Sequence, residues 1–233
     1  MIRFRDRGAR GHARRGWAES WFSFSFGDHF DPRNMGFRSL RVLNEDIITP
    51  GAGFPAHAHE NMEIVTYVLS GTLRHEDDLG NGALIEPGDV QRMSAGTGIR
   101  HSEFNPSASE RAHLLQIWII PDRRCLDPGY EQKRFSPTEQ RNQLITVASA
   151  DGDDDGAVTI HQDARILLGR LDDGAIVTHR LATGRGAWLQ VARGLIALND
   201  TEMRESDGAA IEGESELVIE ALTDAEILLF DLA

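Results

Sequence analysis

Two short stretches of the sequence place metal-ligand side chains at alternate positions. The stretch AHAHENME (56–63) contains His57 and His59, and the stretch AGTGIRHSEFN (95–105) contains His101 and Glu103. Successive side chains on a β-strand point to opposite faces, so residues i and i+2 share a face. If both stretches are strands and lie side by side, three imidazoles and one carboxylate converge on a single point.

This set of side chains suits a divalent first-row transition metal. Iron is the first expectation, with zinc, manganese, cobalt, nickel or copper as alternatives. Four protein ligands leave one or two coordination positions free, which is characteristic of a catalytic site. Two glycines closely precede each pair, which indicates tight backbone geometry there. We therefore expect one metal ion held by His57, His59, His101 and Glu103.

The elements that must position these residues are short β-strands. Apolar segments alternate with Gly, Pro, Asn and Asp along most of the chain, and this rhythm is typical of an all-β sandwich or barrel with few short helices. The main segments span 37–48, 63–71, 112–121, 174–182, 188–199, 215–222 and 226–232. One helical turn is expected in SPTEQRNQ (136–143), with Ser136 as its cap.

The two halves of the chain carry a faint internal repeat. TYVLSGTL (66–73) resembles LQVARGLI (189–196), which aligns Gly71 with Gly194. EPGDVQ (86–91) resembles SDGAAI (206–211), which aligns Gly88 with Gly208. We expect two β-barrels: residues 1–130 with the metal site, and residues 131–233 without metal ligands. Under this alignment the four expected ligands correspond in the second barrel to Arg180, Ala182, Ala221 and Thr223.

Charge and cysteine content limit the expected partners and compartment. Lys and Arg total 24 against 37 Asp and Glu, and the net charge of −13 repels the phosphate backbone of nucleic acids. No apolar run approaches the roughly 20 residues of a membrane-spanning helix, and no hydrophobic signal segment is seen. Cys125 is the one cysteine, so we expect a reducing, cytoplasmic environment. Nucleic acid and membrane are not expected as partners, whereas a protein partner remains open.

The spacing of glycines and ligands resembles the two sequence motifs of cupins. The first motif corresponds to Gly51-x5-His57-x-His59-x3-Glu63, followed by Gly71, and the second to Gly88-x5-Ser94-x-Gly96-x4-His101-x3-Asn105. Ser94 stands where cupins usually have proline. This departure from the cupin pattern, the stretches NMEIVTYVLSG and PGDVQRMSAGTGIRHSE, and the opening residues 16–46 together resemble the sequences of the pirin family. The likeness is strongest to bacterial pirins with quercetin 2,3-dioxygenase activity, and it covers nearly the whole chain.

The resemblance implies a bicupin fold and the same four ligands, with Glu63 outside the ligand set. It also implies that the protein opens the heterocyclic ring of a flavonol such as quercetin with O2, giving a depside and carbon monoxide. The metal would stabilise the deprotonated flavonol hydroxyl, and Glu103 would be the general base.

Two other functions stay open on the sequence. Some pirins are described as transcriptional co-regulators, so the alternative is a metal-containing regulatory protein that acts through protein partners. A third interpretation is a metal-dependent isomerase, or another cupin oxygenase, that acts on a different small phenol.

Several further residues near the motifs have weaker functional interpretations. Four apolar residues could line a flat aromatic pocket, although packing of the barrel core is the stronger expectation: Met62, Met93, Phe104 and Trp118. We assign no ligand partner at i+2 to the remaining histidines, and we expect His113 to be a hydrogen-bonded residue and the others to lie near turns: His12, His29, His75, His113, His161 and His179.

Overall fold

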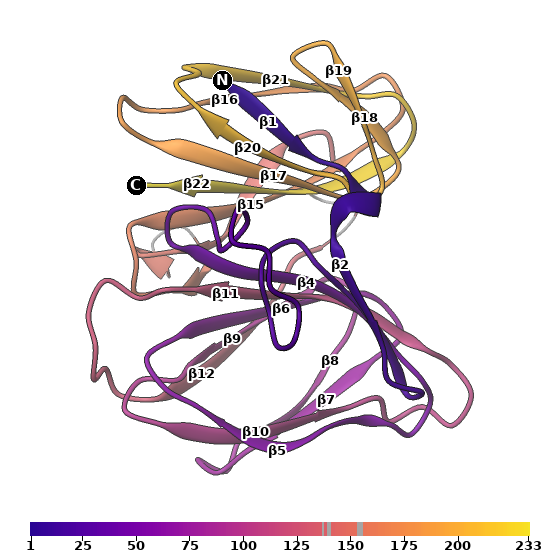
Figure 1. Cartoon of the computed structure of the whole chain (residues 1–233), viewed down its shortest axis with the longest axis vertical. Coiled ribbons are helices and arrows are strands. Elements are labelled where there is room, and N and C mark those ends of the chain that lie inside the picture. The colour runs from indigo at the N-terminus through magenta and orange to yellow at the C-terminus, as the bar shows by residue number, and fades with distance from the viewer. Residues whose placement is uncertain (137, 139–140, 153–155) are drawn as a thin grey trace. The chain divides into compact units, whose positions relative to one another are not determined.

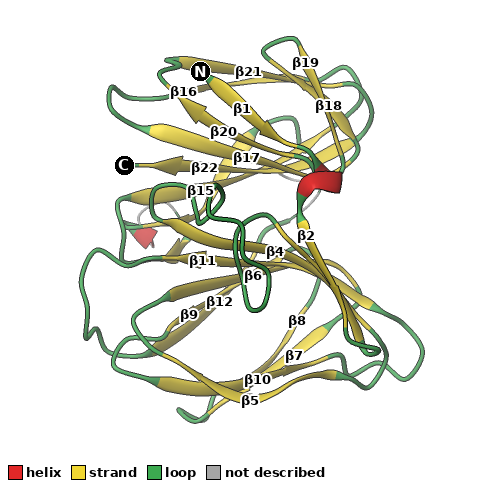
Figure 2. Cartoon of the chain, viewed as in Figure 1, coloured by secondary structure: helices red, strands yellow, loops and turns green. Residues whose placement is uncertain are grey.

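A computed structural model of the chain describes residues 1–136, 138, 141–152 and 156–233. Nearly all of its regular structure is β-strand, so the expected all-β class is confirmed (Figure 2). The helical turn expected at 136–143 includes residues 137, 139 and 140, which lie outside the described part. Among the described residues, no helix has the length and apolar character needed to cross a bilayer.

The chain forms two compact units. The N-terminal unit comprises Gly11–Phe135 and Val158–Gln162, and the C-terminal unit comprises Met1–Arg10, Ser136–Ala157 and Asp163–Ala233. The expected division at residue 130 differs from these units in two ways. It falls inside β12 (Gly129–Arg134), which pairs with the N-terminal unit's strand β9. It also leaves β1 (Ile2–Arg5) in the first domain, whereas β1 pairs with β20 of the C-terminal unit.

Two antiparallel sheets face each other in the N-terminal unit (Figure 1). The smaller sheet has the strand order β5-β10-β7-β8, and the larger has the order β12-β9-β6-β11-β4-β3-β2. The strands of these two sheets are β2 (Gly11–Arg14), β3 (Ala18–Phe22), β4 (Leu40–Ile48), β5 (Gly53–His59), β6 (Glu63–Ser70), β7 (Leu73–Asp77), β8 (Gly82–Ile85), β9 (Asp89–Ser94), β10 (Ile99–Phe104), β11 (Ala112–Ile119) and β12 (Gly129–Arg134). The residues of this unit also include the short strand β14 (Val158–Thr159), which belongs to neither sheet.

The C-terminal unit repeats this architecture. Its smaller sheet has the order β16-β21-β18-β19, and in its larger sheet β1, β20, β17, β22, β15 and β13 are neighbours in that order. The elements are β1 (Ile2–Arg5), the 3-10 helix η1 (Arg7–Ala9), β13 (Leu144–Ser149), β15 (Ala164–Leu171), β16 (Ile176–Arg180), β17 (Gly186–Arg193), β18 (Leu195–Leu198), β19 (Thr201–Arg204), β20 (Gly208–Glu212), β21 (Glu216–Ala221) and β22 (Ala225–Leu232). The expected two-barrel bicupin fold is thus confirmed.

The internal repeat is partly as expected from the sequence. Gly71 and Gly194 are equivalent: both have positive φ, and at each a Cβ would lie within 2.4 Å of a backbone oxygen. Gly194 therefore splits the apolar segment 188–199 into two strands. The alignment of Gly88 with Gly208 is wrong by two residues, because the matching positive-φ position is Ser206. In both turns the following aspartate closes the loop through matching hydrogen bonds.

The interiors of the two units differ in chemistry. In the C-terminal unit the buried side chains of β21 are Leu217, Ile219 and Ala221, and they belong to one large apolar cluster. In the N-terminal unit the corresponding strand β10 buries Ile99, His101 and Glu103. Polar side chains therefore lie inside the N-terminal barrel at positions where the second barrel is filled by apolar ones.

Candidate metal centre

Three histidines converge inside the N-terminal barrel. Strands β5 and β10 pair antiparallel and place His57 directly opposite His101, with His59 two residues further along. The nitrogen atoms that could bind a metal lie within 4.8 Å of one another. The ring centroids are 4.5 to 5.0 Å apart. The i, i+2 spacing thus brings these three side chains together.

A local irregularity of β5 shapes this meeting point. Between the pairs His101↔His57 and Glu103↔Phe54, β5 advances three residues while β10 advances two. Such a bulge bends the strand, and Pro55 is tolerated within it because proline has no N–H for the sheet. Next to the bulge the backbones approach closely, since a Cβ on Gly53 would lie 2.1 Å from the carbonyl oxygen of Glu103. Glycine is required there for sheet pairing at this distance.

The imidazoles present free lone pairs to the site. His57 Nδ1 lies 2.9 Å from the carbonyl oxygen of Pro55, so Nδ1 carries the proton and Nε2 keeps its lone pair. His101 is buried, and its Nε2 has no hydrogen-bond partner among the described residues. Burial, reinforced by His57, lowers the pKa of His59 to about 4. Burial and the neighbouring histidines also hold the pKa of His101 well below its ordinary value, so both rings are neutral at pH 7.

Glu103 lies in the same interior but is held by other partners. Its side chain is buried, and both carboxylate oxygens accept hydrogen bonds from Gln116 Nε2 over 2.7 and 2.9 Å. Thr66 Oγ1 lies 3.4 Å from Oε1. Glu103 comes within 4.8 Å of ligand atoms of His101 and His75, and among the described residues it does not join the group of three histidines. Burial raises its pKa to about 7, against the lowering effect of the Gln116 hydrogen bond.

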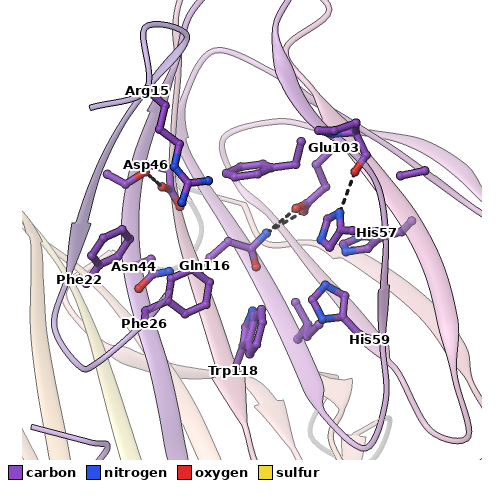
Figure 3. A pocket seen from close by; sticks show the side chains of 16 residues that line it. Arg15, Phe22, Phe26, Asn44, Asp46, His57, His59, Glu103, Gln116 and Trp118 are labelled. Atoms are coloured by element: carbon purple, nitrogen blue, oxygen red, sulfur yellow. Dashed lines mark hydrogen bonds between the residues drawn. The ribbon is translucent and has the colours of Figure 1, made fainter. Parts of the chain in front are cut away.

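A cavity of about 340 Å³ opens beside these residues. In Figure 3 the histidines form one side of it, and aromatic rings from β3, from the segment after β3 and from β11 form its walls. Phe22, Phe26 and Trp118 are the main rings, and Trp118 packs edge-on against His59 at a centroid distance of 4.9 Å. The volume falls within the range of small-molecule sites. The chamber can therefore hold an aromatic ligand in contact with the histidines.

The side of the cavity away from the histidines is polar. Arg15 and Asp46 lie there, with Asp46 accepting a hydrogen bond from Ser20 (Figure 3). Burial raises the pKa of Asp46 to about 6, although the Ser20 hydrogen bond opposes the rise. Two acceptor atoms in the lining, Asn44 Oδ1 and Gln116 Oε1, are buried and have no partner in the described part of the chain. Buried acceptors without partners are costly, so they favour a ligand that donates hydrogen bonds.

The structure also shows which other residues of the sequence lie here. Trp118 fulfils both expectations, because it lines the cavity and also packs against the core cluster that contains Met93. Met62 packs against the same cluster. Phe104 is not among the described residues that line the cavity. The phenylalanine rings that line it belong to Phe22, Phe26 and Phe54. Glu63 points away: it is buried on β6, where it accepts from Ser94 and contacts His161.

The expectation that no remaining histidine has a ligand-type residue at i+2 is wrong for His29, His75 and His161, each of which has an aspartate there, and His75 is the one that reaches the site. His75 is fully buried, and its Nδ1 lies 3.4 Å from His101 Nδ1. The signal was present, because Asp77 stands at i+2 and lies 3.1 Å from His75 Nε2. His113, in contrast, bonds Glu45 as expected. In the C-terminal unit His179 bonds Asp231.

The residues present fit a divalent first-row metal ion. The buried Nε2 of His101 lacks a partner in the described structure and lies beside two further imidazoles. Both features are those of a nitrogen-rich site, and the neighbouring carboxylate of Glu103 adds an oxygen donor of the kind that such ions accept.

Comparisons with known proteins give a consistent picture. Residues 3–119 match the Pirin family, and residues 146–232 match the family described as the quercetinase C-terminal cupin domain. The chain is 46% identical to a quercetin 2,3-dioxygenase of Escherichia coli over 232 residues, covering 100% of this chain and 99% of the relative. A pirin-like protein of Caulobacter vibrioides is 41% identical and covers 96% of each chain.

A solved structure is similar over the whole length. The crystal structure of a bacterial pirin from Escherichia coli in complex with nickel(II) has a TM-score of 0.95 and 46% identity, covering 100% of this chain and 99% of that one. The similarity spans both barrels. The chain therefore belongs to the pirin family.

Proposed function

We propose that this protein is a metal-dependent dioxygenase that opens the heterocyclic ring of a flavonol such as quercetin and releases carbon monoxide. The observation that carries the proposal is the cluster of His57, His59 and His101 on the wall of a cavity that also contains Glu103. The relative named quercetin 2,3-dioxygenase, at 46% identity, supports the same activity.

The ligands in this proposal are His57, His59, His101 and Glu103, and they hold one divalent ion. Iron remains our first expectation for its identity, and the nickel(II) in the related crystal structure makes nickel the main competitor. When bound, the ion supplies positive charge that stabilises the anion of the flavonol 3-hydroxyl.

Glu103 acts as the general base in this scheme. Without a metal ion, burial raises the pKa of this carboxyl to about 7, so Glu103 is a stronger base than an exposed carboxylate and is suited to take up the hydroxyl proton at one oxygen and release it later. Gln116 donates to both oxygens and so fixes the plane of the carboxylate before substrate arrives. The residue therefore combines the basicity and the orientation that proton transfer requires.

The cavity supplies binding for a polyhydroxylated aromatic molecule. The rings of Phe22, Phe26 and Trp118 offer flat apolar contacts to the fused rings of a flavonol. Its hydroxyl groups can donate to the side-chain oxygens of Asn44 and Gln116, which have no partner among the described residues. Filling the cavity with substrate also displaces water from around Glu103, which keeps the pKa of the carboxylate raised during proton transfer.

The proposed partners are thus a flavonol and O2. The net charge of −13 argues against direct binding to nucleic acid. We propose a reducing cytoplasm as the compartment because the sequence has one cysteine, Cys125.

Aerobic turnover of quercetin by protein of measured metal content tests the proposal. The metal-filled protein should consume quercetin and O2 together, and Glu103→Gln should lose about 10²–10⁴-fold in rate with metal retained. Glu63→Gln is the matched control: this carboxylate is also buried but faces away from the cavity, so turnover should persist.

The remaining outcomes separate the alternatives. If quercetin is untouched while the site is filled, the dioxygenase proposal fails for this substrate, and a regulatory protein that acts through a protein partner takes its place. Consumption of quercetin without carbon monoxide would favour a different oxygenase chemistry. If Glu103→Gln turns over at the wild-type rate, the base must be sought at Asp46, which lines the same cavity.

A further inference from the structure

A chain of hydrogen bonds runs from His101 away from the cavity and ends on a carboxylate. His101 Nδ1 lies 3.4 Å from His75 Nδ1, and His75 Nε2 lies 3.1 Å from Asp77 Oδ2. All three residues are adjacent because β7 pairs with β10, where Asp77 is opposite His101 and His75 is opposite Glu103. His75 is fully buried, and its ring packs at a tilt of 37° against that of Tyr130, with the centroids 4.8 Å apart.

The carboxylate at the end of this chain has its orientation fixed by the β7–β8 turn. Asp77 Oδ1 accepts hydrogen bonds from the backbone N–H groups of Leu79 and Asn81, over 3.1 and 2.9 Å. The other oxygen, Oδ2, is therefore the one left to face His75, and it also accepts from Asn81 Nδ2. An ionised carboxylate accepts hydrogen bonds and cannot donate them.

The positions of the protons follow from this arrangement. Because Asp77 only accepts, the proton on the neutral ring of His75 is on Nε2, and its Nδ1 is an acceptor. A hydrogen bond between two Nδ1 atoms requires one donor, so Nδ1 of His101 carries a proton. His101 Nε2 then has a lone pair, and this is the buried atom that lacks a partner among the described residues beside His57 and His59.

We infer that His75 and Asp77 are positioning residues that hold His101 in the tautomer whose Nε2 binds the metal. Partners that support a metal-bound histidine in this way fix its ring and raise its basicity. The inference rests on the proposed role of His101 as a ligand. It adds two residues to the site that no motif of the sequence identified.

The substitution Asp77→Asn tests this chain of hydrogen bonds with almost no change in the shape of the side chain. The two backbone N–H groups will hold the amide oxygen at the Oδ1 position, so the NH2 group faces His75. It then donates to His75 Nε2, the proton of His75 moves to Nδ1, and His101 must carry its proton on Nε2. Glu76→Gln is the matched control, because it removes the same charge one residue away from an exposed side chain.

Nitrogen NMR of the histidine rings in metal-free protein reads the tautomers directly, without any activity. We expect His101 to be protonated at Nδ1 in the wild type and in Glu76→Gln, and at Nε2 in Asp77→Asn. In competition titrations nickel(II) should bind Asp77→Asn about 10–100-fold more weakly than wild type. For Glu76→Gln the loss should stay below about fivefold, as for an exposed charge.

A second pair of variants guards against a folding defect in Asp77→Asn. His75→Asn and His75→Leu have similar volumes, but only Asn offers an acceptor oxygen near the position of Nδ1. Nickel(II) affinity should be largely retained in His75→Asn and lost about 10–100-fold in His75→Leu. Equal affinities in the two variants, or a wild-type His101 protonated at Nε2, would overturn the inference. If instead His101→Ala binds nickel(II) as wild type does, the proposed ligand set fails while the tautomer result still stands.

Discussion

Gln116 donates from Nε2 to both carboxylate oxygens of Glu103, over 2.7 and 2.9 Å. Burial raises the pKa of this carboxyl, and the Gln116 hydrogen bonds lower it, so the pKa settles at about 7. The two residues come from strands in opposite sheets, β10 and β11. Burial thus sets the high basicity of the proposed general base, and Gln116, a residue outside both sequence motifs, moderates it.

Replacing Gln116 by Leu should shift the pH dependence of catalysis. The hydrogen bonds stabilise the ionised form, so their loss raises the pKa of Glu103 further. The acid limb of kcat/KM for quercetin should move to higher pH by about 1–2 pH units, the size expected for hydrogen bonds to a charged group. Thr66→Val removes a longer contact of 3.4 Å and should shift the limb less. An unchanged limb in Gln116→Leu would contradict the role given to this pair.

The contribution of Glu103 to the stability of the metal-free protein should fall as the pH rises toward neutrality, while His59 and His101, whose pKa values are lowered, act in the opposite direction. The pKa of Glu103 is about 7 in the folded protein and near 4.5 when the chain is unfolded. A raised pKa stabilises the fold fully below about 4.5, and this contribution is lost between that pH and about 7, with a slope of up to about 1.4 kcal/mol per pH unit. Urea unfolding from pH 4 to 8 measures it. The difference in unfolding free energy between wild type and Glu103→Gln isolates this contribution, because Asp46 and the histidines act in both proteins. The difference should become less favourable to the wild type between about pH 4.5 and 7, and a difference that does not change with pH would count against the raised pKa.

Removing any one of the three clustered histidines should weaken metal binding strongly. Each of three variants deletes one nitrogen donor: His57→Ala, His59→Ala and His101→Ala. Loss of a residue that only supports a ligand weakens metal binding about 10–100-fold, so the loss of nickel(II) affinity in these variants should be larger than that. His12→Ala is the control, because His12 bonds Glu19 near the surface, outside the cluster. Calorimetric titration of metal-free protein gives the affinities. A wild-type affinity in any of the three cluster variants would remove that histidine from the ligand set.

The fold and the convergence of three site residues could be predicted from the sequence, because both depend on local sequence patterns. The strands follow from apolar runs ended by turn residues, and the convergence of His57, His59 and His101 follows from alternation along two paired strands. Asn44, Gln116 and Arg15 could not be found in this way. They reach the cavity from other strands and loops, and their placement depends on the order β11-β4-β3 in a sheet that pairs segments distant in sequence.

Local signals also failed where they were read too simply. The bulge at Pro55 changes the register between β5 and β10, and the alternation of side chains along the sequence does not predict it. His75-x-Asp77 has the same i, i+2 spacing as the ligand pairs, but its role depends on contact with His101 across the sheet. The repeat was misaligned at Gly88 because Ser206, a residue other than glycine, takes the left-handed position in the second barrel.

Gly53→Ala should damage the site through the backbone. The new Cβ would lie 2.1 Å from the carbonyl oxygen of Glu103, and a backbone oxygen cannot move aside without disturbing β10. The free energy of unfolding should fall by about 1–3 kcal/mol, as for other overpacked positions, and nickel(II) affinity should fall with it. Gly82→Ala is the matched control, since nothing lies within 4 Å of the added methyl group. Equal stability of the two variants in urea would show that the strands can separate without cost.

Carbon monoxide release during metal titration tests the central claim most directly. Metal-free protein is supplied with quercetin in air, and increasing amounts of iron(II) or nickel(II) are added while quercetin and carbon monoxide are measured. The account predicts one carbon monoxide per quercetin consumed and a rate that stops rising at one bound ion per chain. A filled site with no carbon monoxide, or quercetin loss at a rate independent of bound metal, would contradict it.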